Sequence, residues 1–345
     1  MGTRINNKPL NDARLFGSDE FYTLSEDIEK ELCYYKDCFA GKTVYCNCDD
    51  PYESNFVRYF INHFNDLGLA KLVATGYHFK GKRRMAYKAV VTKVDNENLD
   101  DIDAVFAADG NKVVSLGGRG DFMSEANQKL LRKADIVVTN PPFSMFKEYV
   151  DNLIENKKQF LILGNITAIT YKNIFSHISS GKMWCGYGFN MMTVFRTPGF
   201  RESIASNRSF VKFKGYNPDQ GYRKVSGITW FTNLSSSKRN DFYEFTKEYN
   251  PEDYYRYDNY DAIDVQRVKD IPYDYEGVMG VPVTFLEVYN PEQFELIGTG
   301  KGKQGKSMGI GKNYRSRHDL TYTDKYGKKH CPFGRILIRK STASK

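Results

Sequence analysis

Four consecutive residues, Asn140-Pro141-Pro142-Phe143, carry the groups needed to methylate an aromatic amine. The lone pair of such an amine is delocalised into its ring, so a catalyst must hold both N–H groups with acceptors aimed where the nitrogen becomes tetrahedral. The Asn140 side-chain oxygen and the Pro141 carbonyl are two such acceptors. The two prolines fix φ and remove backbone donors that would compete for them. Phe143 offers a flat face on which a base swung out of a duplex can stack.

The elements around these four residues place them at the edge of a buried sheet. The apolar run 134–139 predicts a parallel strand that ends at the prolines, and ligands of open α/β sheets bind at the carboxyl ends of strands. Helical spacing over 146–153 and a second apolar run at 159–163 predict the helix and strand that follow. The four residues, which we call the catalytic corner, are therefore expected at a ligand-binding edge.

The same patterns predict the other elements of the sheet. Residues 42–48 are expected to form the first strand, and Ser54 is expected to cap a helix with Phe56 and Phe60 on its apolar face. Residues 72–75 predict a second strand. The charged stretch 79–100, in which 86–91 could form half of a hairpin, is interpreted as a surface insertion. The segments that would close the sheet are 183–186, 191–195 and 227–232.

Several segments resemble, in the same order, motifs of the EcoRI-type adenine-specific DNA methyltransferases. They are SDEFYT at 18–23, VYCNCDDP at 44–51, GDF at 120–122, the catalytic corner, WFTNL at 230–234 and MGVPVTF at 279–285. This resemblance implies the α/β fold of class I S-adenosylmethionine-dependent methyltransferases, which is Rossmann-like with a mostly parallel seven-stranded sheet. It also implies methyl transfer from S-adenosylmethionine to the exocyclic N6 amine of a flipped adenine in duplex DNA, with a C-terminal region that recognises the target.

The resemblance also assigns the cofactor contacts. Residues 22 and 23 would lie against the methionine end of the cofactor, while residues 121 and 122 would hold its adenine by a hydrogen bond and by packing. Residues 47–49 stand where a glycine-rich loop is usual, and no acid follows strand 72–75 to bind the ribose. The implied cofactor-binding residues are Tyr22, Thr23, Asn47, Cys48, Asp49, Asp121 and Phe122.

Charge is unevenly distributed along the 345 residues. The formal net charge is +8, yet residues 301–345 alone hold 13 Lys and Arg against two acids, a net +11. A basic C-terminal segment favours a polyanionic partner such as duplex DNA, and a solvated tail is the alternative interpretation. With 41% hydrophobic residues, no apolar run near 18 residues and no signal-peptide pattern, we expect a cytoplasmic protein without membrane contact.

The six cysteines suggest neither a disulfide framework nor a metal site. Cys46 and Cys48 lie in a strand-like apolar run, which suits the reduced cytosol of a bacterial cell. Their spacing lacks the two intervening residues of a zinc knuckle, and Cys331 has no second pair nearby. We therefore expect no bound metal.

Two segments are candidates for contact with DNA. Residues 197–224 interleave basic and aromatic side chains, which suits a loop that grips phosphates and stacks on bases, although a merely exposed hairpin fits nearly as well. The second segment, 300–307, is rich in lysine. The DNA-binding candidates are Arg201, Arg208, Lys212, Lys214, Arg223, Lys301, Lys303 and Lys306.

The second segment also matches the phosphate-loop pattern of nucleotide triphosphatases. That pattern requires a helix next, whose N-terminal amides face the phosphate, but Gly309 and Gly311 follow instead. Only 38 residues remain after Ser307, too few for the rest of such a core. We therefore interpret 300–307 as a flexible basic loop over the DNA backbone.

The serines at 235–237 suggest a boundary between residues 1–235, which would bind the cofactor and catalyse, and residues 236–345, which would recognise the target. One catalytic corner accepts one extruded base, so we expect a monomer that modifies a palindrome, specifically GAATTC, in two visits.

Other functions remain open. Enzymes with related corners methylate RNA, protein glutamine or cytosine. Asn rather than Ser at position 140 argues against cytosine as the substrate, and the basic C-terminal segment argues against protein substrates. A DNA-binding protein without activity would be expected to lack Asn140 or Phe143.

Overall fold

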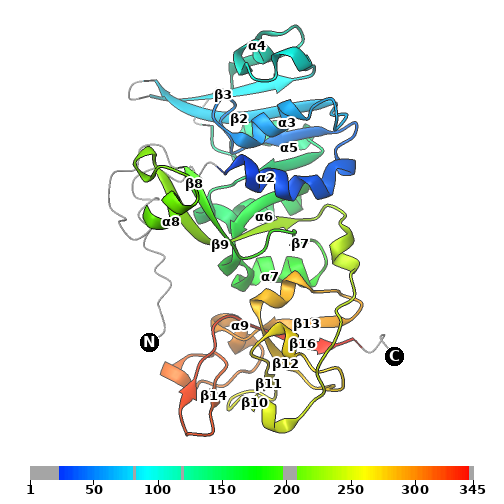
Figure 1. Cartoon of the computed structure of the whole chain (residues 1–345), viewed down its shortest axis with the longest axis vertical. Coiled ribbons are helices and arrows are strands. Elements are labelled where there is room, and N and C mark those ends of the chain that lie inside the picture. Colours follow the sequence, from blue (N-terminus) through cyan, green and yellow to red (C-terminus); the bar gives the residue numbers. More distant parts are fainter. Residues whose placement is uncertain (1–22, 81–82, 118–119, 197–207, 342–345) are drawn as a thin grey trace. The chain divides into compact units, whose positions relative to one another are not determined.

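The computed structural model of the chain describes residues 23–80, 83–117, 120–196 and 208–341 (Figure 1). The chain folds into two compact units. Unit 1 comprises Met1–Asn165 and Asn190–Ser235, and unit 2 comprises Ile166–Phe189 and Ser236–Lys345. Residues 166–189, predicted as part of the first domain, lie in unit 2.

Four parallel strands form the centre of the sheet in unit 1. β1 (Thr43–Cys46) pairs with β2 (Lys71–Lys80) on one side and with β5 (Ile136–Thr139) on the other, and β5 pairs with β6 (Gln159–Asn165). Most side chains of β1, β5 and β6 are buried, as expected for parallel strands covered on both faces. The α/β class and the strands read from these apolar runs are confirmed.

Antiparallel strands extend this sheet at both edges. β3 (Arg83–Val91) forms a long hairpin with β2 and also pairs with β4 (Lys112–Ser115). At the other edge, β9 (Tyr222–Thr232) pairs with β6 and with β8 (Met191–Arg196). The strand order within unit 1 is β4-β3-β2-β1-β5-β6-β9, with β8 beside β9.

The sheet differs from the prediction in its edges and in its number of strands. Its centre is parallel, but its edges are antiparallel and unit 1 alone supplies seven strands in line plus β8. The prediction that 86–91 forms half of a hairpin is confirmed by the pairing of β3 with β2, whereas the interpretation of 79–100 as a surface insertion was wrong, because β3 belongs to the sheet. The small and β-branched side chains of Ala86, Ala89 and Val91 are buried and allow β3 to pack as part of the sheet.

Short helices accompany the sheet of unit 1 (Figure 1). α3 (Asn55–Asn62) begins at Ser54, whose hydroxyl accepts a hydrogen bond of 3.1 Å from the Phe56 backbone N–H, so the predicted cap is confirmed. Phe56 and Phe60 are buried. The other helices are α2 (Ser25–Leu32), η1 (Cys33–Cys38), η2 (Asn96–Asn98), α4 (Ile102–Ala107), α5 (Glu125–Lys133), η3 (Phe143–Met145), α6 (Phe146–Glu155), α8 (Arg208–Phe213) and η6 (Pro218–Gln220).

Unit 2 is built on a five-stranded sheet in the order β10-β11-β12-β16-β13. Arg335 Nε donates to Asp264 Oδ1 at 2.7 Å in its interior, and the Tyr257 hydroxyl donates to the same carboxylate at 2.5 Å. The strands of this unit are β7 (Trp184–Cys185), β10 (Tyr255–Arg256), β11 (Ile263–Asp264), β12 (Met279–Pro282), β13 (Phe294–Thr299), β14 (Tyr322–Thr323), β15 (Lys329–His330) and β16 (Arg335–Lys340). Its α-helices are α7 (Lys172–Ser179) and α9 (Gly302–Ser307). In the ranges that the structure describes, no helix is long and apolar enough to cross a membrane.

Candidate functional site

The candidate site lies where the carboxyl ends of β1 and β5 meet. These strands are direct neighbours, with Val44 opposite Ile136 and Tyr45 opposite Val137. From β1 the parallel sheet continues in one direction through β2 and in the other through β5. Such a reversal of strand order leaves a crevice outside the carboxyl ends, which is the usual ligand site of open α/β sheets.

The catalytic corner leaves β5 directly at this edge. Pro141 is buried, and Pro142 precedes η3 with φ −57° and ψ 120°. Phe143 is partly exposed and packs edge to face with Phe195, with 6.4 Å between ring centroids. The Asn140 Nδ2 atom donates a hydrogen bond of 3.3 Å to Thr23 Oγ1, which fixes the plane of the Asn140 amide.

Asp49 joins the loop after β1 to this corner. Its side chain is only 6% exposed. One carboxylate oxygen accepts from the Thr139 hydroxyl, the other accepts from the Ser54 hydroxyl at 2.7 Å, and the Asn140 backbone N–H also donates to the carboxylate. Burial raises the pKa of Asp49 to about 7, although these hydrogen bonds oppose the rise.

Asn47 also accepts hydrogen bonds from groups in the protein interior. The Tyr149 hydroxyl, from α6, donates to Asn47 Oδ1, and Thr75 Oγ1 donates to the Asn47 carbonyl at 3.3 Å. Thr139 Oγ1 in turn accepts from the Cys48 backbone N–H at 3.2 Å. Because the side chains of Asn47 and Asp49 point into the protein, this loop brings backbone to the sheet edge without the glycines that are usual there.

The segment predicted to hold the adenine of the cofactor is close to this loop. The Asp121 carboxylate is exposed, and Oδ1 accepts from the Met123 backbone N–H at 2.8 Å. Burial raises the pKa of the Cys48 thiol, and the nearby charges of Asp49 and Asp121 raise it further. Phe122 is 5% exposed and packs edge to face on Tyr149, with 5.0 Å between ring centroids.

Asn127 fixes this segment to the sheet. Its Nδ2 atom donates to the carbonyls of Gly120 and Asp121 at 3.1 and 2.7 Å, and its Oδ1 accepts from the Tyr45 hydroxyl at 2.8 Å. The position of Asp121 is therefore set by a fully buried amide that is itself bonded to β1.

Most of the predicted cofactor residues are thus brought to one edge of the sheet. Thr23, Asn47, Cys48, Asp49, Asp121 and Phe122 are connected to each other or to the corner through Thr139, Tyr149 and Asn140. Tyr22 lies outside the described residues. The ribose role stays unassigned, because Thr75 is buried and Asp50, the nearest acid in the loop, accepts from the Tyr87 hydroxyl.

The residues that the sequence analysis missed are the connectors. Thr139 and Tyr149 looked like an ordinary strand end and an ordinary helix residue, and Asn127 carried no signal at all. The available signal was a hydroxyl residue closing an otherwise apolar buried strand. A polar group at that position must find a partner, and here it finds Asp49.

The basic candidates of residues 197–224 do not form one loop. α8 and the beginning of β9 lie within this stretch. Lys212 and Lys214 are exposed, and Phe213 beside them is 83% exposed. Arg223 is partly buried, and burial lowers its pKa. Arg208 begins α8, whereas Arg201 lies outside the described residues.

Residues 302–307 of the lysine-rich segment form α9, so the prediction of a flexible loop was wrong. Gly305 lets α9 pack closely against the segment at His318. A Cβ atom at position 305 would lie 2.2 Å from the His318 carbonyl oxygen. Lys303 and Lys306 are exposed, whereas Lys301 Nζ lies 4.6 Å above the Phe333 ring. α9 lies within the motif itself and ends at Ser307, so this segment does not have the geometry of a phosphate loop followed by a helix.

The chain matches the family described as adenine-specific methyltransferase EcoRI over residues 9–341. It is 41% identical to the type II methyltransferase M.EcoRI of Escherichia coli, with 100% of both chains covered. It is 40% identical to the type II methyltransferases M.MgeORF184P of Mycoplasma genitalium and M.MpnI of Mycoplasma pneumoniae, with 84% of this chain covered in each case, and 85% and 84% of theirs. No solved structure matches the chain.

Proposed function

The chain belongs to the EcoRI family of adenine-specific DNA methyltransferases, and from this premise we propose that it methylates N6 of an adenine turned out of duplex DNA. The observation that carries the proposal is the catalytic corner, placed at the carboxyl end of β5 beside the loop after β1. A methyl donor and an aromatic amine can meet at such an edge. The proposed cofactor is S-adenosylmethionine, in a class I, Rossmann-like methyltransferase unit.

The proposed role of the corner is to make the adenine amine nucleophilic. Asn140 Oδ1 and the Pro141 carbonyl accept its two N–H groups, so that the nitrogen lone pair leaves the ring and points at the methyl carbon. The hydrogen bond from Asn140 Nδ2 to Thr23 supports this role, because it presents the amide oxygen in a fixed orientation. Neither acceptor is a base, so the proton released after transfer passes to solvent.

Phe143 is proposed to hold the extruded base by stacking. Its ring is supported by Phe195 and remains partly exposed. A base stacked on an aromatic side chain gains about 1–3 kcal/mol, which offsets part of the energy of unstacking it from the duplex.

S-adenosylmethionine, when bound, supplies an electrophilic methyl group on sulfur. The residues present fit it: the loop at 47–50 offers backbone at the sheet edge, and the exposed Asp121 carboxylate offers an acceptor for an adenine amino group. Asn47 and Asp49 use their side chains elsewhere, so we propose that their part of the loop contacts the cofactor through backbone. Phe122 has little free ring surface, and its role is mainly to hold Asp121 against α6 through Tyr149.

Asp49 is proposed as a positioning residue of this site. Its side chain is directed away from substrate and cofactor, and it bonds Thr139 and the Asn140 backbone on one side and Ser54 on the other. It therefore keeps the amine-binding and cofactor-binding loops in one arrangement.

The proposed partner is duplex DNA, bound by a monomer in the cytoplasm, with unit 2 contributing to target recognition. The similarity to M.EcoRI over the full chain supports GAATTC as the specific target. The exposed Lys212, Lys214, Lys303 and Lys306 suit contacts with phosphates.

The experiment is to incubate the protein with labelled S-adenosylmethionine and separate pools of duplex DNA, single-stranded DNA and RNA. Label in N6-methyladenine from duplex DNA supports the proposal. Label confined to RNA, or found in N4-methylcytosine, rejects it.

A further inference from the structure

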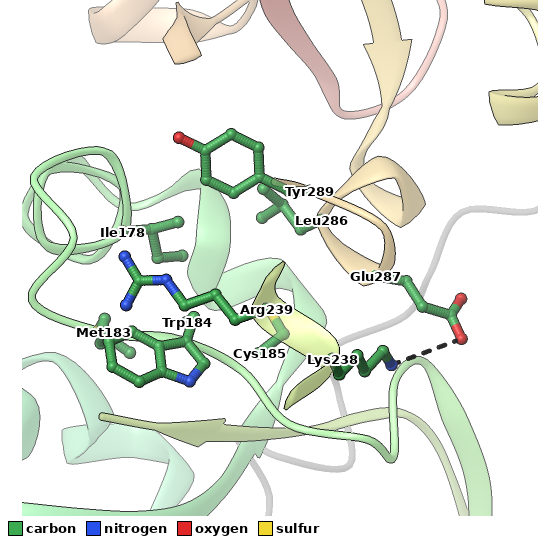
Figure 2. A pocket seen from close by; sticks show the side chains of 9 residues that line it. All are labelled: Ile178, Met183, Trp184, Cys185, Lys238, Arg239, Leu286, Glu287 and Tyr289. Atoms are coloured by element: carbon green, nitrogen blue, oxygen red, sulfur yellow. Dashed lines mark ion pairs between the residues drawn. The ribbon is translucent and has the colours of Figure 1, made fainter. Parts of the chain in front are cut away.

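A pocket within unit 2 contains an arginine that no sequence motif includes (Figure 2). Arg239 reaches across this pocket from the segment that follows the serines at 235–237, and its side chain lies over Trp184 (Figure 2). The pocket is lined by Ile178, Met183, Trp184, Cys185, Lys238, Arg239, Leu286, Glu287 and Tyr289.

The guanidinium of Arg239 is held by a ring rather than by an anion. Its Cζ atom lies 3.8 Å from the centre of the Trp184 ring system. Among the residues that the structure describes, this guanidinium has no hydrogen-bond or ion-pair partner. Burial lowers the pKa of Arg239, yet an arginine side chain remains charged in proteins. A partly buried charge without a partner is costly, so a bound anion would relieve it.

The neighbouring charges are already matched to each other. Lys238 Nζ lies 4.0 Å from Glu287 Oε1 (Figure 2) and also donates to the carbonyls of Gly186 and Tyr187 at 3.5 and 3.4 Å. Glu287 is the one carboxylate among the lining residues, and its partner is Lys238. Arg239 is therefore the cation of this pocket whose charge is left for a ligand.

We propose that Arg239 binds a phosphodiester group of duplex DNA. This proposal rests on the proposed function, which makes a polyanion the substrate. A planar guanidinium presents two parallel N–H groups that match two phosphate oxygens, and stacking on Trp184 holds that plane in place. The contact adds affinity and fixes unit 2 on the duplex, but it reads no sequence, because every nucleotide carries the same phosphate.

The test compares Arg239→Gln with Arg267→Gln. Arg267 is an arginine of the same unit that already donates to Asp270 at 2.7 Å, so its removal changes the net charge equally without emptying the pocket. Binding of a duplex oligonucleotide is measured from 50 to 300 mM KCl. One lost phosphate contact changes the slope of log affinity against log salt by about 0.9, so Arg239→Gln should be shallower by that amount and Arg267→Gln unchanged. Equal slopes for wild type and Arg239→Gln, or equal changes in both variants, overturn the proposal.

A second measurement covers the case in which Arg239→Gln loosens the fold. Arg239→Lys keeps the charge without the planar fork, and it should keep the salt slope while losing several-fold in affinity. Duplexes with one neutral methylphosphonate at successive positions then locate the contact. One position should weaken binding by wild type but have no further effect on Arg239→Gln, whereas additive losses at every position contradict a direct contact.

The same samples separate this proposal from the proposed function. If wild type methylates adenine in the duplex while Arg239→Gln binds with an unchanged salt slope, the pocket assignment fails and the proposed function stands. If wild type binds the duplex without methylating adenine, the proposed function fails instead.

Discussion

Thr139, the last residue of β5, donates its hydroxyl hydrogen bond to Asp49 in the loop that follows β1. The two residues are 90 positions apart in the chain, and their bond joins the loop proposed to approach the cofactor to the corner proposed to hold the substrate amine. Methyl transfer requires both partners in one geometry, and a buried carboxylate with several donors is a rigid way to fix it.

Thr139→Val should break this connection without changing the side-chain shape. A buried carboxylate that loses one donor costs about 1–3 kcal/mol, so the free energy of unfolding should fall by that amount in a denaturant titration. A positioning role predicts in addition that kcat falls more than the affinity for S-adenosylmethionine. Thr139→Ser, which keeps the hydroxyl, should restore both. An unchanged kcat in a destabilised Thr139→Val protein would limit the bond to a structural role.

The raised pKa of Asp49 predicts a specific dependence of the free energy of unfolding on pH. Its pKa is raised from 3.8 to about 7 in the folded protein, so folding favours the protonated acid. The stability that the protonated Asp49 contributes is fully present below pH 3.8 and is lost as the pH rises through 7. The free energy of unfolding should therefore fall by up to about 1.4 kcal/mol per pH unit in this range. Asp49→Asn should remove this slope between pH 4 and 7, as measured by urea unfolding. The matched control, Asp109→Asn, changes an exposed carboxylate and should keep it.

Asn140→Ala should abolish most turnover while leaving the cofactor affinity within a few-fold. The lost amide oxygen is one of two acceptors for the reacting amine, and removing one such preorganised group typically costs about 10²–10³ in rate. Single-turnover methylation of a duplex measures the rate, and calorimetry with S-adenosylmethionine measures the affinity. Turnover at a tenth of the wild-type rate is incompatible with the proposed role.

Asp121→Ala should weaken cofactor binding. A hydrogen bond to a charged group is worth about 1.5–3 kcal/mol, or roughly 10- to 150-fold in Kd. The change also removes the acceptor for the Met123 N–H, so Asp121→Asn, which keeps an acceptor there, serves as the comparison. Unchanged affinity in both variants would move the adenine site away from this segment.

The centre of the fold followed from sequence because buried parallel strands are continuous apolar runs. Val44, Ile136 and Leu161 lie in such runs, and each is fully buried in the predicted strand. At one edge the hairpin strand 86–91 was predicted but its place in the sheet was not, because β3 carries charged residues among its small ones and its pairing with β4 depends on the whole sheet. α9 was missed because its residues are all glycine, lysine, glutamine or serine and give no helical apolar pattern.

The residues of the site could be predicted from sequence, but the role of each residue could not. The motif order located Asn140, Asp49 and Asp121, and the structure brings them to one edge of the sheet. Sequence could not reveal that Asp49 faces inward, because that depends on Thr139 and Ser54, which are distant in the chain or carry another obvious role. Arg239 gave no signal because its partner, Trp184, precedes it by 55 residues.

The most direct test of the proposed function is to methylate a GAATTC duplex with the wild-type protein, digest it and identify the modified nucleoside by mass spectrometry. We predict N6-methyladenine at the second adenine of the site, with hemimethylated duplex appearing before the fully methylated product. Methylation of another base, or none in duplex DNA while S-adenosylmethionine is bound, would contradict the account.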